Sequence, residues 1–242
     1  MNLTKKQENT LEEIKSFESE PKVVQLFDNK EISKLLDLYN SLPITTHNIT
    51  QKTIKKRWLQ NYSKEMDKLY VSKLKEVLGD FKMDNLKSES GEDFFGLFQE
   101  SYSPLKLHVD SGFFDSTLIY KQTLVPLSEF GETVIFKNRW YGFSTNFIHS
   151  DHEKDFKRNI TEVGRNRVTN EHKGIYGDKA FDKDVYKKYL SHENYENLKG
   201  LEVAKVYKWK MGEMLIFDRT ALHCSSCNIK NKKIGLATFT KK

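Results

Sequence analysis

From Asp93 onward the chain consists of short β-branched and aromatic segments separated by turn residues. Strands at this spacing are typical of a β-sandwich or jelly roll, because each strand alternates its side chains between a core face and an outer face. Pro126 should end one strand, and 128–131 and 211–213 read as turns. The sequence therefore predicts a mainly β chain with flanking helices. The expected strands are residues 94–99, 105–110, 116–125, 132–136, 201–209, 214–223 and 233–240.

Residues 1 to about 90 have apolar residues at the three- and four-residue spacing that predicts amphipathic helices. Three stripes show this spacing, and the third ends at Gly79. We expect these helices to cover one outer face of the sheet. The stripes are Leu11, Ile14, Phe17; Ile32, Leu35, Leu36, Tyr39; and, from Thr53, Ile54, Trp58, Tyr62, Met66, Tyr70, Leu74, Leu78.

Residues 140 to about 200 interrupt the strand pattern with polar, charged and glycine-containing sequence. Long irregular segments inside a compact domain usually have a function, so we interpret this one as an insertion over the site. Within it, 181–190 is expected to be helical. A chain of 242 residues suits one domain, with a helical support at 1–92 and a β core at 93–242 that contains the insertion.

Composition limits the possible classes of protein. No apolar run approaches the roughly 18 residues of a membrane helix, and Met1–Glu8 has no apolar stretch after it, so we expect a cytoplasmic chain. The net charge of +6 comes from 40 basic and 34 acidic residues that are intermixed, which favours a solvated lysine-rich surface but leaves a nucleic-acid partner open. Cys224 and Cys227 are too few for a disulfide framework, and we interpret them as bystander thiols.

Two separated segments carry the residues of interest. In a strand at 105–110, His108 and Asp110 lie on one face while Leu107 and Val109 pack on the other. A second apolar strand, 214–223, ends in His223. Two histidines and one carboxylate form a ligand set that leaves coordination positions of ferrous iron open. Alone, a His-x-Asp pair is a poor signal, because such pairs occur by chance and His108 then reads as an ordinary surface histidine.

The order of the motifs is more specific. His108-Val109-Asp110 is followed by a glycine turn at 131–133, by Gly212-Glu213 before the strand that ends in His223, and by Lys233 ten positions later. In this order, over roughly residues 93–240 without the insertion, the chain resembles the iron(II)- and 2-oxoglutarate-dependent oxygenases. Their core is a double-stranded β-helix, also described as a jelly roll or cupin-like fold. The likeness is greatest to small, lysine-rich members from marine microbial and viral genomes.

The resemblance implies that His108, Asp110 and His223 hold Fe²⁺, with 2-oxoglutarate and O₂ as cosubstrates and ascorbate as a stimulant. It implies a dioxygenase that hydroxylates a small polar substrate and releases succinate and CO₂, acting as a monomer or weak homodimer. Asp110 favours hydroxylation over halogenation, since a small residue replaces this carboxylate in related halogenases. The alternatives are a demethylase or hydroxylase of nucleic acid or protein, and a jelly-roll binding module without catalysis.

The resemblance also assigns residues to the cosubstrate. Lys233 would bind the far carboxylate of 2-oxoglutarate, although arginine is commoner there and lysine lacks its bidentate fork. Gly235 shares the face of Lys233 and would leave room for the cosubstrate, whereas Lys232 would point away. Tyr120 would donate to the same carboxylate, or else be an ordinary core aromatic, and Gln122 would contact the keto acid.

Substrate residues are expected in the insertion and near His223. Arg219 lies four positions before His223, so a regular strand would place both on one face. Each candidate also reads as a surface or loop-packing residue. The candidates for substrate binding are Trp140, Tyr141, Arg165, Arg167 and Arg219.

Overall fold

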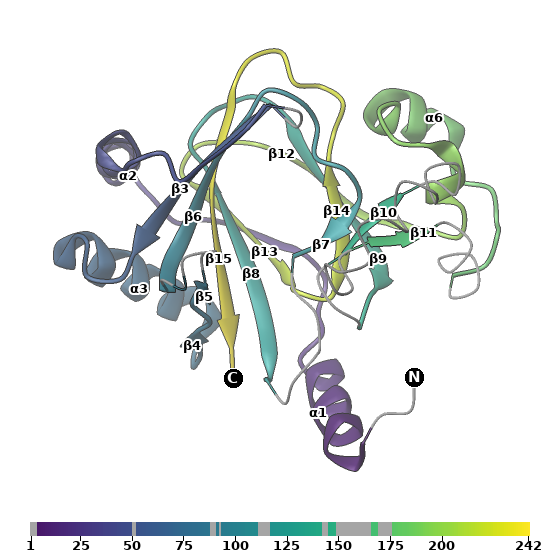
Figure 1. Ribbon diagram of the computed structural model, residues 1–242, viewed down its shortest axis with the longest axis horizontal. Coiled ribbons are helices and arrows are strands. Elements are labelled where there is room, and N and C mark those ends of the chain that lie inside the picture. Colours follow the sequence, from purple (N-terminus) through teal and green to yellow (C-terminus); the bar gives the residue numbers. More distant parts are fainter. Residues whose placement is uncertain are drawn as a thin grey trace.

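The computed structural model describes residues 4–49, 52–87, 91, 93–110, 117–141, 145–148, 166–168 and 176–242, and for 145–148 and 166–168 it describes the backbone only. Two β-sheets face each other, with helices on their outer sides (Figure 1). The helices are α1 (Lys5–Ser16), α2 (Asn29–Ser41), α3 (Lys64–Leu78) and α6 (Lys183–Val185), which continues as a π-helix at Tyr186–Leu190; a 3₁₀ turn follows at Tyr195–Leu198.

The larger sheet has the strand order β1-β13-β8-β15-β6-β3-β2, with β4 paired to β15 and β5 paired to β6. All of its pairs are antiparallel. Its strands are β1 (Lys22–Gln25), β2 (Thr46–Asn48), β3 (Thr53–Leu59), β4 (Lys82–Met83), β5 (Leu86–Lys87), β6 (Asp93–Ser101), β8 (Ile119–Pro126), β13 (Glu213–Asp218) and β15 (Lys233–Lys241).

The smaller sheet has the order β11-β10-β7-β14-β9-β12, antiparallel except for the β10 and β11 pair. Side chains from both sheets meet between them in an apolar core that includes Ile135, Trp209 and Leu215. This arrangement confirms the predicted jelly roll. The strands are β7 (His108–Val109), β9 (Glu132–Arg139), β10 (Thr145–Ile148), β11 (Asn166–Val168), β12 (Val203–Lys208) and β14 (Ala221–Ser225).

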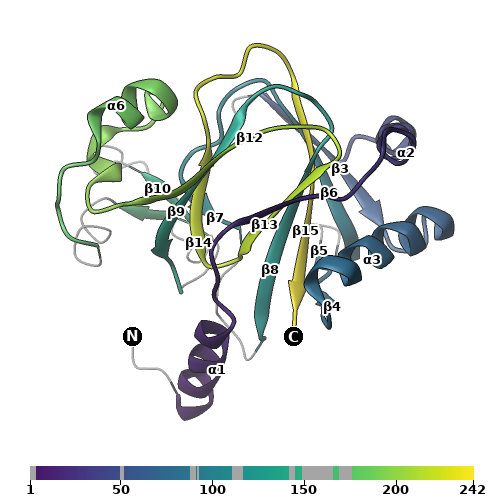
Figure 2. The same ribbon diagram turned by 180° about the vertical axis from the view of Figure 1, so that it is seen from behind.

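Helices α2 and α3 cover the outer face of the larger sheet, as predicted (Figures 1 and 2). Asp28 and Glu31 form a capping box that begins α2, and Gly79 ends α3 with a positive φ of 66°. Leu35 of α2 and Tyr70 of α3 are fully buried in the resulting cluster, together with Trp58 of β3. These contacts hold the sheet rigid from outside.

The expectation that residues 1–92 are helical is wrong in part, because this region also contains β1 to β5. The clearest case is the stretch Thr53–Leu59, which is strand β3. Ile54 and Trp58 lie four residues apart, and an interval of four puts two side chains on one face in a helix and in a strand alike. The spacing therefore does not distinguish the two structures there.

The predicted single strand 214–223 is also wrong. It divides into β13, which pairs with β8 in the larger sheet, and β14, which pairs with β7 and β9 in the smaller one. Arg219 and Thr220 form the corner between the sheets. Every residue from 214 to 226 is buried, including the polar run Asp218-Arg219-Thr220 at the corner. That run interrupts the apolar residues, but nothing in the sequence shows that the chain passes from one sheet to the other there.

The described part of the insertion, 176–201, packs on the outer face of the smaller sheet (Figure 1). Leu190 and Leu198 lie there against Leu107 and Leu222, and Cys224 is a free thiol whose pKa is raised by burial. The helix expected at 181–190 is confirmed. This part lies behind the sheet and does not cover the site; for the rest of 140–200 the idea stays a prediction, since 142–144, 149–165 and 169–175 lie outside the described residues.

A buried carboxylate joins three segments near the corner. Asp218 pairs with Lys121 of β8 and, at 2.9 Å, with Arg139 of β9. Its Oδ2 also accepts the backbone N–H of Ser19 at 3.0 Å, while Lys121 donates to the carbonyl of Phe17 at 2.8 Å. The segment after α1 is thus bound to both sheets. Among the described helices, none has the length and apolar character needed to cross a membrane.

Candidate metal centre

His108, Asp110 and His223 meet on the inner side of the smaller sheet. Strand β14 places His223 directly opposite His108 of β7, and Asp110 follows β7 by one residue. One ligand atom from each residue lies within 4.8 Å of the others. The Nε2 of His223 is 3.2 Å from Asp110 Oδ2, and that of His108 is 3.5 Å from Asp110 Oδ1. The predicted two-histidine, one-carboxylate set is therefore assembled.

Both imidazoles are oriented by the backbone. The Nδ1 of His108 contacts the carbonyl oxygen of Lys106, and that of His223 contacts the carbonyl oxygen of Ala221 at 3.0 Å. A carbonyl oxygen only accepts, so each Nδ1 donates its proton there and each ring turns its Nε2 toward Asp110. Two imidazole Nε2 atoms and a carboxylate thus face one another. A cation among them would satisfy all three, which is how these residues fit a divalent metal.

The pKa shifts of Asp110 and His108 reflect how closely the three side chains interact. Burial alone would raise the pKa of Asp110, but the two imidazoles outweigh it and hold this pKa well below its ordinary value. Burial lowers the pKa of His108, and the Asp110 carboxylate more than reverses that effect, so the pKa is raised. The amide nitrogen of Gln122, on β8, also donates to Asp110. Its buried Oε1 has no hydrogen-bond partner among the described residues.

Lys233 lies further along the same interior. Its ammonium sits 4.0 Å from the ring centre of Trp209 and donates to the Glu132 carbonyl at 3.1 Å and to Ser225 Oγ at 3.3 Å. Ser225 is two residues beyond His223 on the same face of β14, which corresponds to roughly 7 Å. Burial lowers the pKa of Lys233 to about 7. Lys232, by contrast, is 55% exposed and points outward, so the predicted register is confirmed.

The role predicted for Gly235 is wrong. A Cβ at this position would lie 2.7 Å from the indole of Trp209 and 3.0 Å from Leu124. The space beside Gly235 is therefore occupied by Trp209, whose Nε1 donates to Thr133 Oγ1 at 2.9 Å. The glycine makes room for the tryptophan on which Lys233 rests, not for a ligand.

This packing gives a stability prediction. Gly235→Ala should destabilise the protein by about 1–3 kcal/mol, because a methyl group is forced into a filled core. Chemical denaturation measures the effect. Gly235→Ala combined with Trp209→Phe should recover part of the loss, since the smaller ring leaves the space that the methyl needs. Full stability of the single variant would contradict the packing described above.

The prediction that Tyr120 donates to the same 2-oxoglutarate carboxylate as Lys233 is also wrong. The antiparallel register pairs Gly235 with Pro126, so Tyr120 lies six residues away along β8, roughly 20 Å. Tyr120 instead packs edge-on against Phe17, with ring centres 5.8 Å apart, and under the ammonium of Lys242. Gln122, two residues further in, does reach the centre. The prediction that Tyr120 and Gln122 share a face of β8 is consistent with the structure, but Tyr120 lies too far along the strand to reach Lys233.

The described substrate candidates have partners within the protein. Tyr141 donates to Glu18 at 2.7 Å, and Trp140 packs against the outer apolar cluster of the smaller sheet. Arg219 is buried at the corner and pairs with Asp84 at 2.6 Å, so the single-strand argument that placed it beside His223 fails. Arg165 and the side chain of Arg167 lie outside the described residues. That Arg165 and Arg167 bind the substrate stays a prediction.

Sequence reasoning missed two residues of this site. Ser225 was within reach, because it follows His223 by two and must share its face. Trp209 carried no signal, since only the fold brings it beneath Lys233.

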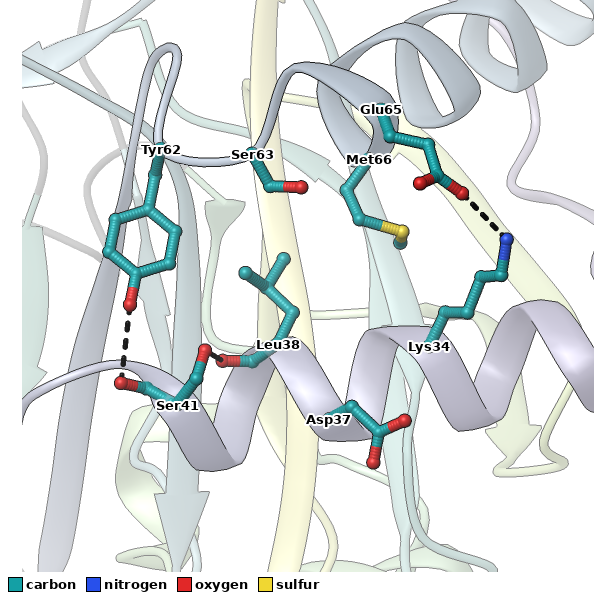
Figure 3. A pocket seen from close by; sticks show the side chains of 8 residues that line it. All are labelled: Lys34, Asp37, Leu38, Ser41, Tyr62, Ser63, Glu65 and Met66. Atoms are coloured by element: carbon teal, nitrogen blue, oxygen red, sulfur yellow. Dashed lines mark hydrogen bonds and ion pairs between the residues drawn. The ribbon is translucent and has the colours of Figure 1, made fainter.

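A surface depression of about 410 Å³ lies elsewhere, between α2 and α3 (Figure 3). Among its polar groups, Lys34 pairs with Glu65 at 2.7 Å, and the Tyr62 hydroxyl donates to the Ser41 carbonyl at 3.3 Å. Because both helices lie on the outer side of the larger sheet, this depression is separate from the metal centre. Its lining residues are Lys34, Asp37, Leu38, Ser41, Tyr62, Ser63, Glu65 and Met66.

No family model and no curated protein matches the sequence. Solved structures do match over nearly the whole chain. The non-heme alpha ketoglutarate dependent epimerase SnoN from nogalamycin biosynthesis is 9% identical with a TM-score of 0.51, over 97% of this chain and 84% of that one. The structure of SnoN in complex with Fe³⁺, alpha ketoglutarate and nogalamycin RO is 10% identical, with a TM-score of 0.50, over 98% of this chain and 83% of that one. HygX from Streptomyces hygroscopicus, with nickel, 2-oxoglutarate and hygromycin B bound, is 11% identical, with a TM-score of 0.49, over 99% of this chain and 87% of that one. The chain thus has the fold of the 2-oxoglutarate-dependent oxygenases, which confirms the resemblance at the level of fold.

Proposed function

We propose that this protein is a non-haem Fe(II)- and 2-oxoglutarate-dependent dioxygenase that hydroxylates a small polar substrate and releases succinate and CO₂. The observation that carries the proposal is the meeting of His108, Asp110 and His223 with a buried lysine placed further along the same inner surface. The neighbouring structures that contain iron or nickel and 2-oxoglutarate support the choice of cofactors.

The metal would be held by the two Nε2 atoms and the carboxylate. When bound, iron and 2-oxoglutarate supply the oxidising power that lets O₂ react with a C–H bond. The chain supplies geometry: the backbone carbonyls of Lys106 and Ala221 keep both rings turned inward. Three protein ligands would leave the remaining positions of the ion open to the cosubstrates.

Lys233 would bind the far carboxylate of 2-oxoglutarate. Its present hydrogen-bond acceptors, the Glu132 carbonyl and the Ser225 hydroxyl, are both neutral, so a carboxylate would bring the missing opposite charge. Its position about two residues past His223 suits a five-carbon dicarboxylate that also reaches the metal. The Trp209 ring lies 4.0 Å from the Lys233 ammonium, a cation–π contact that favours the charged form of the lysine.

Gln122 would fix the carboxylate ligand. It donates to Asp110 Oδ2, the oxygen nearest His223 Nε2. That donation restricts rotation of the Asp110 carboxylate, and the free Oε1 remains as an acceptor for a hydrogen-bond donor in the site.

The low pKa of Lys233 predicts how cosubstrate binding responds to pH. Without ligand the pKa is about 7, so above pH 7 the lysine is mostly neutral and must take up a proton to bind a carboxylate. The affinity for 2-oxoglutarate should therefore fall as pH rises above 7, by up to roughly tenfold per unit. Titration of the metal-loaded protein with 2-oxoglutarate between pH 6 and 9 measures this. Lys233→Arg, whose charge does not titrate there, should flatten the curve; an equally steep curve in both proteins would contradict the assignment.

A succinate-release screen tests the function itself. Purified protein with Fe²⁺, 2-oxoglutarate and ascorbate would be given amino acids, nucleosides, small peptides and methylated oligonucleotides in turn. A small-molecule hydroxylase should respond to one of the first three groups, and a nucleic-acid demethylase to the last. A binding module would bind no iron and would release no succinate under any condition.

A further inference from the structure

A buried carboxylate lies behind the metal-bearing wall. Glu193 belongs to the segment 176–201 on the outer face of the smaller sheet, and its side chain is only 1% exposed. Its Oε1 accepts the backbone N–H of Leu107 at 2.7 Å. Burial raises the pKa of Glu193, which shows that the position is costly for a charged group. A carboxylate kept at such a position is expected to have a role that offsets this cost.

The peptide group that Glu193 binds is the one that orients a metal ligand. The Lys106–Leu107 peptide gives its N–H to Glu193, while its carbonyl oxygen accepts Nδ1–H of His108. Carboxylate, peptide and imidazole are thus connected in series. A negative acceptor on the N–H also polarises the peptide, so that its carbonyl becomes a better acceptor.

The two histidines differ in how their supporting carbonyl is held. Ala221, which supports His223, is itself paired with Arg139 of β9. Strand β7 lies between β10 and β14, but it is only two residues long and its pairs with both strands begin at His108. The Lys106–Leu107 peptide lies just before this short ladder. The carbonyl of Leu105 before it accepts the N–H of Ser225 at 3.1 Å, and Glu193 accepts the N–H of Leu107. Loss of the Glu193 contact would therefore leave the plane of this peptide, and the direction of its carbonyl toward His108, less firmly fixed.

We propose that Glu193 is a positioning residue of the metal centre, acting on His108 through the Lys106–Leu107 peptide. It fixes that peptide so that the carbonyl faces Nδ1 and Nε2 faces the ion. In many metal sites a carboxylate or carbonyl contacts the ligand histidine directly, and its loss weakens metal binding 10- to 100-fold. Here the carboxylate would act one peptide group further away. The inference rests on the proposed metal centre.

Two replacements separate positioning from simple filling of space. Glu193→Gln keeps an oxygen that can accept the Leu107 N–H, whereas Glu193→Met keeps the volume and has no such acceptor. Glu196→Gln is the matched control, because Glu196 lies three residues away and forms a partly exposed pair with Lys199 at 2.8 Å. Thermal unfolding of each metal-free variant shows whether it folds.

The test is binding of Co²⁺ to the metal-free protein, followed by the visible absorption of the ion. Glu193→Met should bind Co²⁺ 10- to 100-fold more weakly and with altered band intensities, since His108 is no longer aimed. Glu193→Gln should stay within about threefold of the parent protein, because the acceptor is kept. Equal affinity of Glu193→Met and the parent would overturn the inference, as would equal weakness of both variants.

The same titration keeps this inference apart from the proposed function. If the parent protein binds Co²⁺ and His108→Ala does not, the metal centre stands, and Glu193 is judged on its own variants. If the parent itself fails to bind Co²⁺, the proposed metal centre fails and the inference falls with it. If Glu193→Met does not fold, Glu193→Ala takes its place with the same expected loss.

Discussion

His223→Ala should reduce 2-oxoglutarate turnover to background while the protein keeps its fold. His223 supplies one of the three ligands, and an ion held by two remaining side chains would be bound weakly and without a fixed orientation. The ring contributes little else: it packs edge-on against Phe217, with centres 4.9 Å apart, in a core that many other residues fill. Succinate release and bound iron measure the loss, and circular dichroism checks the fold.

The companion variants His108→Ala and Asp110→Ala should behave in the same way, because each removes one ligand. Lys34→Ala is a suitable control, since Lys34 lies on α2 in an exposed pair with Glu65 and far from the centre in the fold. It should retain both iron and turnover. Substantial activity after any two of the three ligand changes would refute the metal centre.

Lys233→Ala should raise the 2-oxoglutarate concentration needed for half-maximal turnover by roughly 10- to 100-fold. A hydrogen bond to a charged group contributes about 1.5–3 kcal/mol, and the Lys233 side chain that would make this one is buried. The iron content should be unchanged, because Lys233 does not contact the three ligands in the fold. Initial rates at varied 2-oxoglutarate measure the change.

Lys232→Ala is the matched control for that variant. The two lysines are neighbours in sequence, but Lys232 points outward and its ammonium lies 3.7 Å from Glu100. Its removal should leave the 2-oxoglutarate requirement within about twofold of the parent, because the Lys232 side chain points away from the metal centre. If Lys232→Ala raised the requirement and Lys233→Ala did not, the cosubstrate assignment would be wrong.

The sequence predicted those features of the site that depend on alternation within one strand. His108 and Asp110 share a face, and Lys233 points inward while Lys232 does not, because a period of two leaves no other choice. The three ligands were also grouped correctly, because their residue types and order are specific to one kind of centre. The first inference is local, whereas the second joins residues 113 positions apart and rests on the family resemblance in the order of the motifs.

The failures concern distances between strands and changes of direction. The register of β8 against β15 decides that Tyr120 lies far from Lys233, and nothing within either segment specifies that register. The corner at Arg219 and Thr220 falls in a polar run, but no local pattern shows that the chain changes from one sheet to the other there. The role of Gly235 depends on Trp209, which reaches it only after folding. Each error is one of tertiary packing.

The carboxylate of Asp218 has a consequence for how the molecule opens. It is bound at once to a strand of each sheet and to the segment after α1, and it is almost wholly excluded from water. Detaching residues 17–19 would leave Lys121 with fewer acceptors in a buried place, so fraying of this segment and separation of the two sheets would be coupled events. Residues 17–19 therefore belong to the same cooperative unit as the two sheets, and their amide protons should exchange with solvent at rates set by that unit.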